Sequence, residues 1–179
     1  MRLPVPVEAL WDELQSVRAE ILEEIDGLSQ AQLDWRPDER EWSIGEIIHH
    51  LTLAEVSTGK LTSKLFKEAG PSVSSFPGDL TAFTALPPWP PGPAEAPPLV
   101  RPEAGHERQE LFSAFLAARE RSRQSIERLA TGDPRALSWS HPRFGVLDLA
   151  QWWQLQARHD ADHLGQLRGV KAAPGFPTA

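Results

Sequence analysis

The sequence contains no cysteine. Disulfide bonds, thiolate nucleophiles and zinc sites built on cysteine are therefore excluded. Any site for a transition metal has to use histidine and carboxylate side chains. The candidate imidazoles are six: His49, His50, His106, His141, His159 and His163.

The chain also lacks an excess of basic residues, since acidic residues outnumber them. The chain has 18 Lys and Arg against 25 Asp and Glu, a formal charge of −7, which is unsuited to attracting phosphate backbones or anionic lipid. No stretch approaches the roughly 18 apolar residues of a membrane span, and no basic start followed by an apolar run marks a signal peptide. We therefore expect a soluble, cytoplasmic protein that binds neither nucleic acid nor membrane.

Along much of the sequence, apolar residues recur at spacings of three and four. This spacing forms one stripe on a helix and does not fit the alternation of a strand. At 179 residues the chain fits one domain, residues 1–179. It predicts an all-α fold, a four-helix bundle, with helices at about residues 7–28, 43–69, 102–130 and 148–170.

Two of these helices carry recognisable start signals. Ser43 followed by Glu46 forms a capping box, flanked by Trp42 and Ile47 in the positions of a hydrophobic staple. Asp148 is the expected N-cap of the last helix, with Gln151 three residues on.

Residues 71–102 are rich in proline and hold ten of the 17 prolines of the chain. Neither a helix nor a central strand persists through such a segment. A flexible linker between two domains is one interpretation, but neither side alone has enough periodic segments for a stable core. We favour a long crossover between the second and third helices, and we expect a short extended piece at residues 136–140.

His159 and His163 are four residues apart, so they lie about 40° from each other around the last helix. The sector that they share includes Trp152, which predicts that both imidazoles face the bundle interior beside a large aromatic ring. On the second helix, His50 falls about 60° from the centre of the apolar stripe, whereas His49 falls about 160° away. Helix geometry therefore selects His50 as the inward residue.

If the second and fourth helices pack side by side, His50 meets His159 and His163. Three neutral imidazoles suit zinc, nickel, copper or ferrous iron and leave a coordination position for water or substrate. A metal held in this way lowers the pKa of bound water and can ionise or orient a thiol.

Two other interpretations of the pair stay open. Two histidines on one helix often only cap it or form hydrogen bonds. The run "HDADH" is also a variant of the His-Glu-x-x-His motif, with Asp160 as general base. That variant is weak, because Asp is one methylene shorter than Glu and no third ligand follows downstream.

We expect the remaining polar residues near these helices to face outward. Asp160 and Asp162 are expected in solvent or as groups that orient an imidazole, and Glu55 is expected to face solvent or another helix. The Arg- and Glu-rich face "AARERSRQSIER" is typical of a solvated surface. The other histidines are expected at the surface: His49, His106 and His141.

The stretches "WSIGEIIHHLTLAE" and "HPRFGVLDLAQWWQLQARHDADHLGQLRG" resemble the DinB/YfiT-like family of small four-helix proteins. The resemblance implies that His50, followed by Leu51, joins His159 and His163 to bind a divalent metal, commonly zinc or nickel. It also implies a homodimer. Residues 71–102 match nothing in this family and are expected to shape the mouth of the pocket.

The resemblance favours a metal-dependent enzyme that acts on a small molecule. One form is a thiol S-transferase that uses a low-molecular-weight thiol, and the other is a hydrolase. The alternative is a non-enzymatic binding or dimerisation module whose metal is structural or absent. The seven tryptophans are compatible with that alternative, since large aromatic rings also fill cores.

Overall fold

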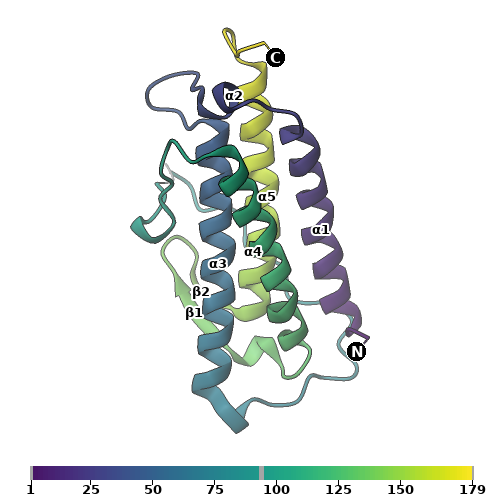
Figure 1. Cartoon of the computed structure of the whole chain (residues 1–179). Helices are drawn as coiled ribbons and strands as arrows, with labels where there is room; N and C mark the ends of the chain where they lie inside the picture. Colours follow the sequence, from purple (N-terminus) through teal and green to yellow (C-terminus); the bar gives the residue numbers. More distant parts are fainter. Residues whose placement is uncertain (1, 93–94, 179) are drawn as a thin grey trace.

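Four long helices form the body of the molecule in the computed structural model, which describes residues 2–92 and 95–178 (Figure 1). They are α1 (Val5–Ile25), α3 (Ile44–Ala69), α4 (Arg108–Leu129) and α5 (Leu149–Ala172). The predicted four-helix bundle is therefore confirmed. Residues 93 and 94 of the predicted proline-rich loop lie outside the described residues.

The smaller elements sit at the ends of the bundle and in its connections. They are α2 (Gln30–Asp34), the 3-10 turns η1 (Gly70–Ser72), η2 (Pro98–Val100) and η3 (Pro134–Ala136), and the antiparallel strands β1 (Ser138–His141) and β2 (Gly145–Asp148).

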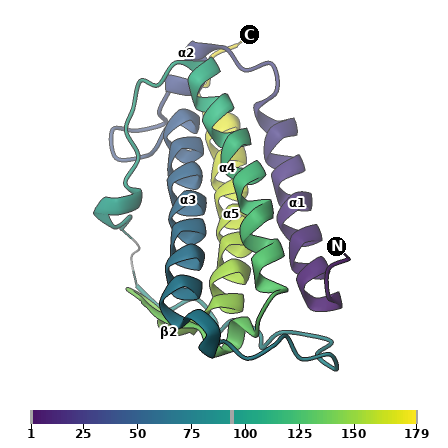
Figure 2. The same ribbon diagram turned by 60° about the horizontal axis from the view of Figure 1, so that its bottom comes forward.

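Helices α3 and α4 run in the same direction. Near their starts, His49 of α3 contacts His106, which lies just before α4. In their last turns, the Arg128 guanidinium of α4 lies 5.2 Å from the centre of the Phe66 ring of α3. A chain that leaves the end of α3 must therefore return over about 39 Å before α4 begins. Figure 2 shows this connection crossing the lower end of the bundle and rising outside α3. We call residues 73–92 and 95–107 the strap, and they provide the predicted crossover.

Helix α5 lies beside α3 and runs antiparallel to it. The Trp153 indole donates to the Thr62 hydroxyl at 3.0 Å, and Thr58 faces Gln156 one turn further along. Helix α1 packs on α5 and α4 and closes the bundle. The side-by-side packing that brings His50 toward the last helix is thus present.

The predicted helix starts are confirmed. Ser43 and Glu46 form a reciprocal capping box at α3, and Asp148 and Gln151 form another at α5. Gly70 ends α3 with a positive φ of 51°, a conformation that glycine adopts without a steric penalty.

Several boundaries differ from the predicted ones. The first helix ends at Ile25 rather than near residue 28, because Ser29 and Gln32 form a capping box that starts α2. The third helix begins at Arg108 rather than near residue 102, where the strap still runs. The expected extended piece at residues 136–140 is one strand of a hairpin.

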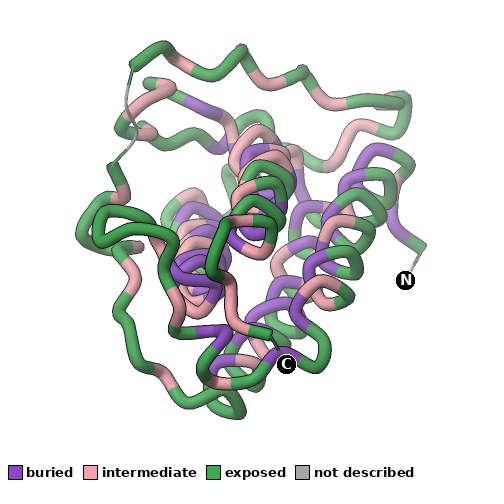
Figure 3. Tube along the Cα trace, turned by 90° about the horizontal axis from the view of Figure 1, so that it is seen from above, coloured by how far each residue is buried: buried purple, intermediate pink, exposed green. Residues whose placement is uncertain are grey.

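The core consists of two apolar halves, one at each end of the bundle. Seen from above, the buried side of each long helix faces inward (Figure 3). On α1 the change from one half to the other falls between Leu14 and Ile21, and on α3 between Leu51 and Leu65. The layer between the halves is polar, and the histidines lie close to it. No helix of the described residues is long and apolar enough to cross a membrane.

Candidate metal centre

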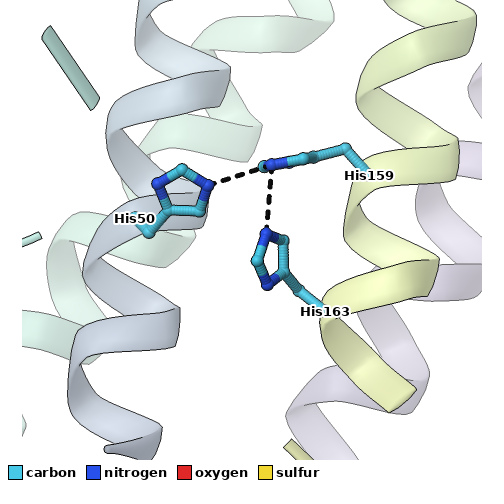
Figure 4. A group of neighbouring side chains, drawn as sticks. All are labelled: His50, His159 and His163. Carbon is cyan, nitrogen blue, oxygen red and sulfur yellow. Dashed lines mark hydrogen bonds between the residues drawn. The ribbon is translucent and has the colours of Figure 1, made fainter. Parts of the chain in front are cut away.

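Three imidazoles meet between α3 and α5 (Figure 4). His50 Nε2 lies 2.9 Å from His159 Nε2, and His163 Nε2 lies 3.1 Å from the same atom. The three ligand atoms all lie within 4.8 Å of one another. We call His50, His159 and His163 the histidine cluster; the structure brings together the three residues that the sequence selected.

The far ring nitrogens of two members are fixed by oxygen atoms. His50 Nδ1 lies 2.6 Å from the carbonyl oxygen of Val100, and His163 Nδ1 lies 2.7 Å from Gln166 Oε1. These oxygens only accept hydrogen bonds, so each Nδ1 must donate. In a neutral imidazole the Nε2 atom then carries the lone pair, and both lone pairs face His159.

The cluster therefore has too few protons for its contacts. Nε2 of His159 carries at most one hydrogen, while two lone pairs approach it, so one close nitrogen pair has no proton to share. A cation at the meeting point removes this conflict. Tetrahedral zinc with Zn–N bonds of about 2.0–2.1 Å holds its nitrogens roughly 3.4 Å apart. The two close pairs, at 2.9 and 3.1 Å, reach that separation with shifts of a few tenths of an ångström, and all three atoms lie within 4.8 Å of one another.

Burial keeps these imidazoles neutral. It lowers the pKa of His50 to about 4, and His50 is only 4% exposed. Burial, together with the neighbouring histidines, lowers the pKa of His159 well below its ordinary value, and burial also lowers the pKa of His163. Neutral imidazole is the form that binds a metal, so all three are ready at neutral pH. His159 and His163 remain partly exposed, so the cluster is not sealed in the core.

The aromatic ring beside the cluster is Trp42 and not Trp152. Trp42 stacks on His163 with ring centres 5.9 Å apart, and its ring centre lies 4.8 Å from that of His50. Trp152 instead donates to the Trp139 carbonyl and packs on His141. Helical angles could not find Trp42, because this residue precedes the cap and lies outside the helix; its position in the staple was the available signal.

The strap forms the outer side of the centre. Besides the Val100 carbonyl, it supplies the Glu103 backbone N–H, which donates to His49 Nδ1 at 2.9 Å, and His106, whose Nε2 lies 3.1 Å from that same atom. His49 and His106 are thus partly buried in a contact between α3 and the strap, rather than simply solvated. His141 is likewise partly buried, in the hairpin, and none of the three joins the cluster.

Asp160 is the clearest departure from the prediction, and Glu55 faces other helices, the second of its two expected positions. Both side chains are fully buried, and both bind arginines inside the bundle. Asp160 accepts from Arg119 at 3.1 Å and from Gln156 at 2.7 Å, so its two oxygens have partners other than the histidines. This arrangement gives no support to Asp160 as a general base. Asp162 is exposed, as expected.

The prediction of a solvated Arg- and Glu-rich face on α4 was wrong at Arg119, for a physical reason. The Arg- and Glu-rich face of α4 suggested a solvated surface, but Arg119 on that helix is only 5% exposed. A buried arginine cannot be told from an exposed one by residue type alone. The signal available was the alignment of Arg119 with Phe115 and Ser122, which lie on the apolar stripe.

Three comparisons with known proteins each match most of this chain. Residues 13–167 match the sequence model of the DinB superfamily. The chain is 24% identical over 167 residues to the uncharacterized protein YuaE of Bacillus subtilis (strain 168), covering 86% of this chain and 92% of that protein. The crystal structure of TT2238, a four-helix bundle protein, aligns with a TM-score of 0.63 and 19% identity over 91% of this chain and 98% of that one. At this identity the structural likeness shows the fold alone.

Proposed function

We propose, from the premise that this chain belongs to the DinB superfamily, that its histidine cluster binds a divalent metal ion, zinc or nickel in the first instance. The observation that carries the proposal is the shortage of protons among the three Nε2 atoms. Two of them are held with their lone pairs toward the third by Val100 and Gln166. In metalloproteins generally, a hydrogen bond from the ring nitrogen that does not bind the metal orients the histidine ligand.

The bound metal serves catalysis in this proposal. Three protein ligands leave coordination positions for water or substrate, as catalytic sites do, whereas structural zinc sites use four. The metal supplies acidity to a bound water or thiol. The residues of the chain hold it in place, and Trp42 covers one side of the imidazoles.

Two reactions are candidates for this site. In the first, a low-molecular-weight thiol is transferred to a small electrophile; in the second, a small ester or amide is hydrolysed. Incubation with a thiol and a chloro- or epoxide electrophile separates them, because a transferase forms the conjugate only with thiol present and a hydrolase turns over without it. We also propose a homodimer, as the family resemblance implies.

Metal analysis of untagged protein, purified from its native host, tests the binding itself. We expect about one equivalent of metal in the wild type, and loss of most of it in His163→Ala. His141→Ala is the matched control, since His141 is partly buried but lies outside the cluster. Metal that survives His163→Ala in full amount would refute the site.

A structural metal is the second candidate function, favoured by the position of the cluster between two packed helices. It predicts that chelation lowers the melting temperature strongly while no thiol, water or small anion enters the coordination sphere. Spectra of the cobalt-substituted protein with and without added thiol decide between the two, because a change on adding thiol requires a free position.

A further inference from the structure

A second polar cluster occupies the layer between the two apolar halves of the core, and the metal proposal does not use it. It contains one charged residue from each long helix, and each side chain is almost completely buried. We call these four residues the charge quartet: Arg18 of α1, Glu55 of α3, Arg119 of α4 and Asp160 of α5.

The quartet is closed by ion pairs between its own members. Glu55 binds Arg18 through one oxygen and Arg119 through the other, the second at 2.6 Å. Asp160 lies 3.1 Å from Arg119 and 3.5 Å from Arg18. Two positive and two negative groups cancel, so burying the set avoids the desolvation penalty of an unpaired charge.

The arginines also tie the helix backbones together. Arg18 of α1 donates to the carbonyl of Phe115 on α4 at 2.9 Å, and Arg119 of α4 donates in return to the carbonyl of Leu14 on α1. These bonds are directional, whereas the apolar contacts on either side are not. Together with the hydrogen bond from Trp153 of α5 to Thr62 of α3, the quartet is therefore a directional part of the core that distinguishes one axial register of the helices from another.

The register in question is the one that forms the histidine cluster. Asp160 follows His159 directly on α5, and Glu55 lies five residues, about 7.5 Å, beyond His50 on α3. A slip of α5 by one turn, about 5.4 Å, separates Asp160 from Arg119 and at the same time carries His159 away from His50. The two polar clusters thus depend on the same alignment of α3 and α5.

We propose that the charge quartet is a set of positioning residues for the metal site, which fixes the axial register of α5 against α3 so that the three imidazoles meet. This inference rests on the proposed metal binding. Buried ion pairs are often replaceable by apolar residues without loss of stability, and their best-attested use is to specify register. The expected consequence of their removal is thus a misplaced site in a protein that still folds.

The variant that tests this is Arg119→Met with Asp160→Asn, which removes one charge of each sign and leaves Arg18 paired with Glu55. The control is Arg123→Met with Glu127→Gln, which removes a pair of the same signs from the partly exposed face of α4. Circular dichroism establishes that each variant is folded. If the first variant does not fold, Arg119→Gln with Asp160→Asn replaces it, because that pair also removes one charge of each sign and keeps side chains that can form hydrogen bonds to each other.

Register is measured without any metal. The chain has no cysteine, so single cysteines placed at the exposed positions Lys60 and Ala161 accept spin labels cleanly. We expect the distance distribution between α3 and α5 to broaden, with a population displaced by about one helical turn, 5.4 Å, in the quartet variant and none in the control. An unchanged distribution would overturn the inference.

Metal binding is measured in parallel with Co²⁺, whose visible spectrum reports ligand geometry. We expect the quartet variant to bind Co²⁺ about 10-fold more weakly or worse, with an altered spectrum, although every histidine is intact. A displaced register with unchanged Co²⁺ binding would overturn the link to the metal site. Failure of the wild type to bind Co²⁺ contradicts the proposed function instead, and the spin-label distances still decide whether the quartet sets the register.

Discussion

The histidine cluster and the charge quartet are neighbours in the same bundle, yet they balance their polar groups in opposite ways. The quartet pairs two cations with two anions, and its carboxylates each accept from more than one donor. The histidine cluster brings three basic nitrogens together with too few protons between them. Charges that are paired with their neighbours favour a structural role, whereas basic nitrogens brought together without enough protons support the proposed metal binding.

The largest effect is expected from unbalancing the quartet. Glu55→Gln leaves two buried arginines with one carboxylate, and it should reduce the free energy of unfolding by about 3–5 kcal/mol. Urea denaturation monitored by circular dichroism measures the change. Glu127→Gln, at the partly exposed pair on α4, should cost no more than about 1 kcal/mol. An equal reduction in the free energy of unfolding of the two variants would show that the buried ion pairs contribute no more to stability than the partly exposed pair.

Removal of the metal should destabilise the wild type but not a protein whose cluster is broken. A metal at one hundred times its dissociation constant adds about 2.7 kcal/mol to the stability of the folded state. Adding a chelator should therefore lower the melting temperature of the wild type and leave that of His159→Ala unchanged. A chelator effect of equal size in both proteins would place the metal elsewhere.

A smaller effect is expected from the contact that orients His163. Gln166→Leu removes the acceptor of its Nδ1 proton and should weaken metal binding by about 10–100-fold. Titration of metal-free protein with Zn²⁺ against a competing chelator measures the affinity. Gln154→Leu is the control on the same helix, because the Gln154 side chain donates to the Thr84 carbonyl of the strap and lies outside the histidine cluster. An affinity lost equally in both variants would mean that α5 as a whole was disturbed.

The smallest effect is expected where charges meet at the surface. Hydrogen bonds from Lys171 and Arg168 lower the pKa of Glu24, which links α1 to α5. Glu24→Gln should reduce the free energy of unfolding by no more than about 1 kcal/mol near neutral pH. Because the pKa is depressed in the folded state, this contribution is present above the unfolded value of about 4.3 and disappears as the pH falls further. Denaturation at pH 7 and at pH 3 checks both parts; a difference between wild type and variant that grows at pH 3 would contradict them.

The regular parts of the fold were predictable because they follow from spacing along one helix. Periodicity placed the four helices, capping boxes marked two starts, and helix angles chose His50 over His49. The short α2 was missed although Ser29 and Gln32 carry the same capping signal as Ser43 and Glu46. That signal is present in the sequence, but no long apolar stripe follows it.

The parts that were not predictable depend on contacts between distant segments. Trp42 and the Val100 carbonyl reach the cluster from outside the two helices that carry it, and no periodicity reports their position. The quartet was invisible for a related reason. Arginine and carboxylate side chains favour solvent, so burial has to be inferred from all four helices at once.

The most direct test of metal binding at the histidine cluster is anomalous diffraction from crystals of the untagged protein, grown with zinc or nickel and recorded at the absorption edge of that metal. We expect one strong peak about 2.0–2.1 Å from Nε2 of His50, His159 and His163, with further ligand density that is not protein. A strong peak elsewhere, or none at the three nitrogens, would contradict it.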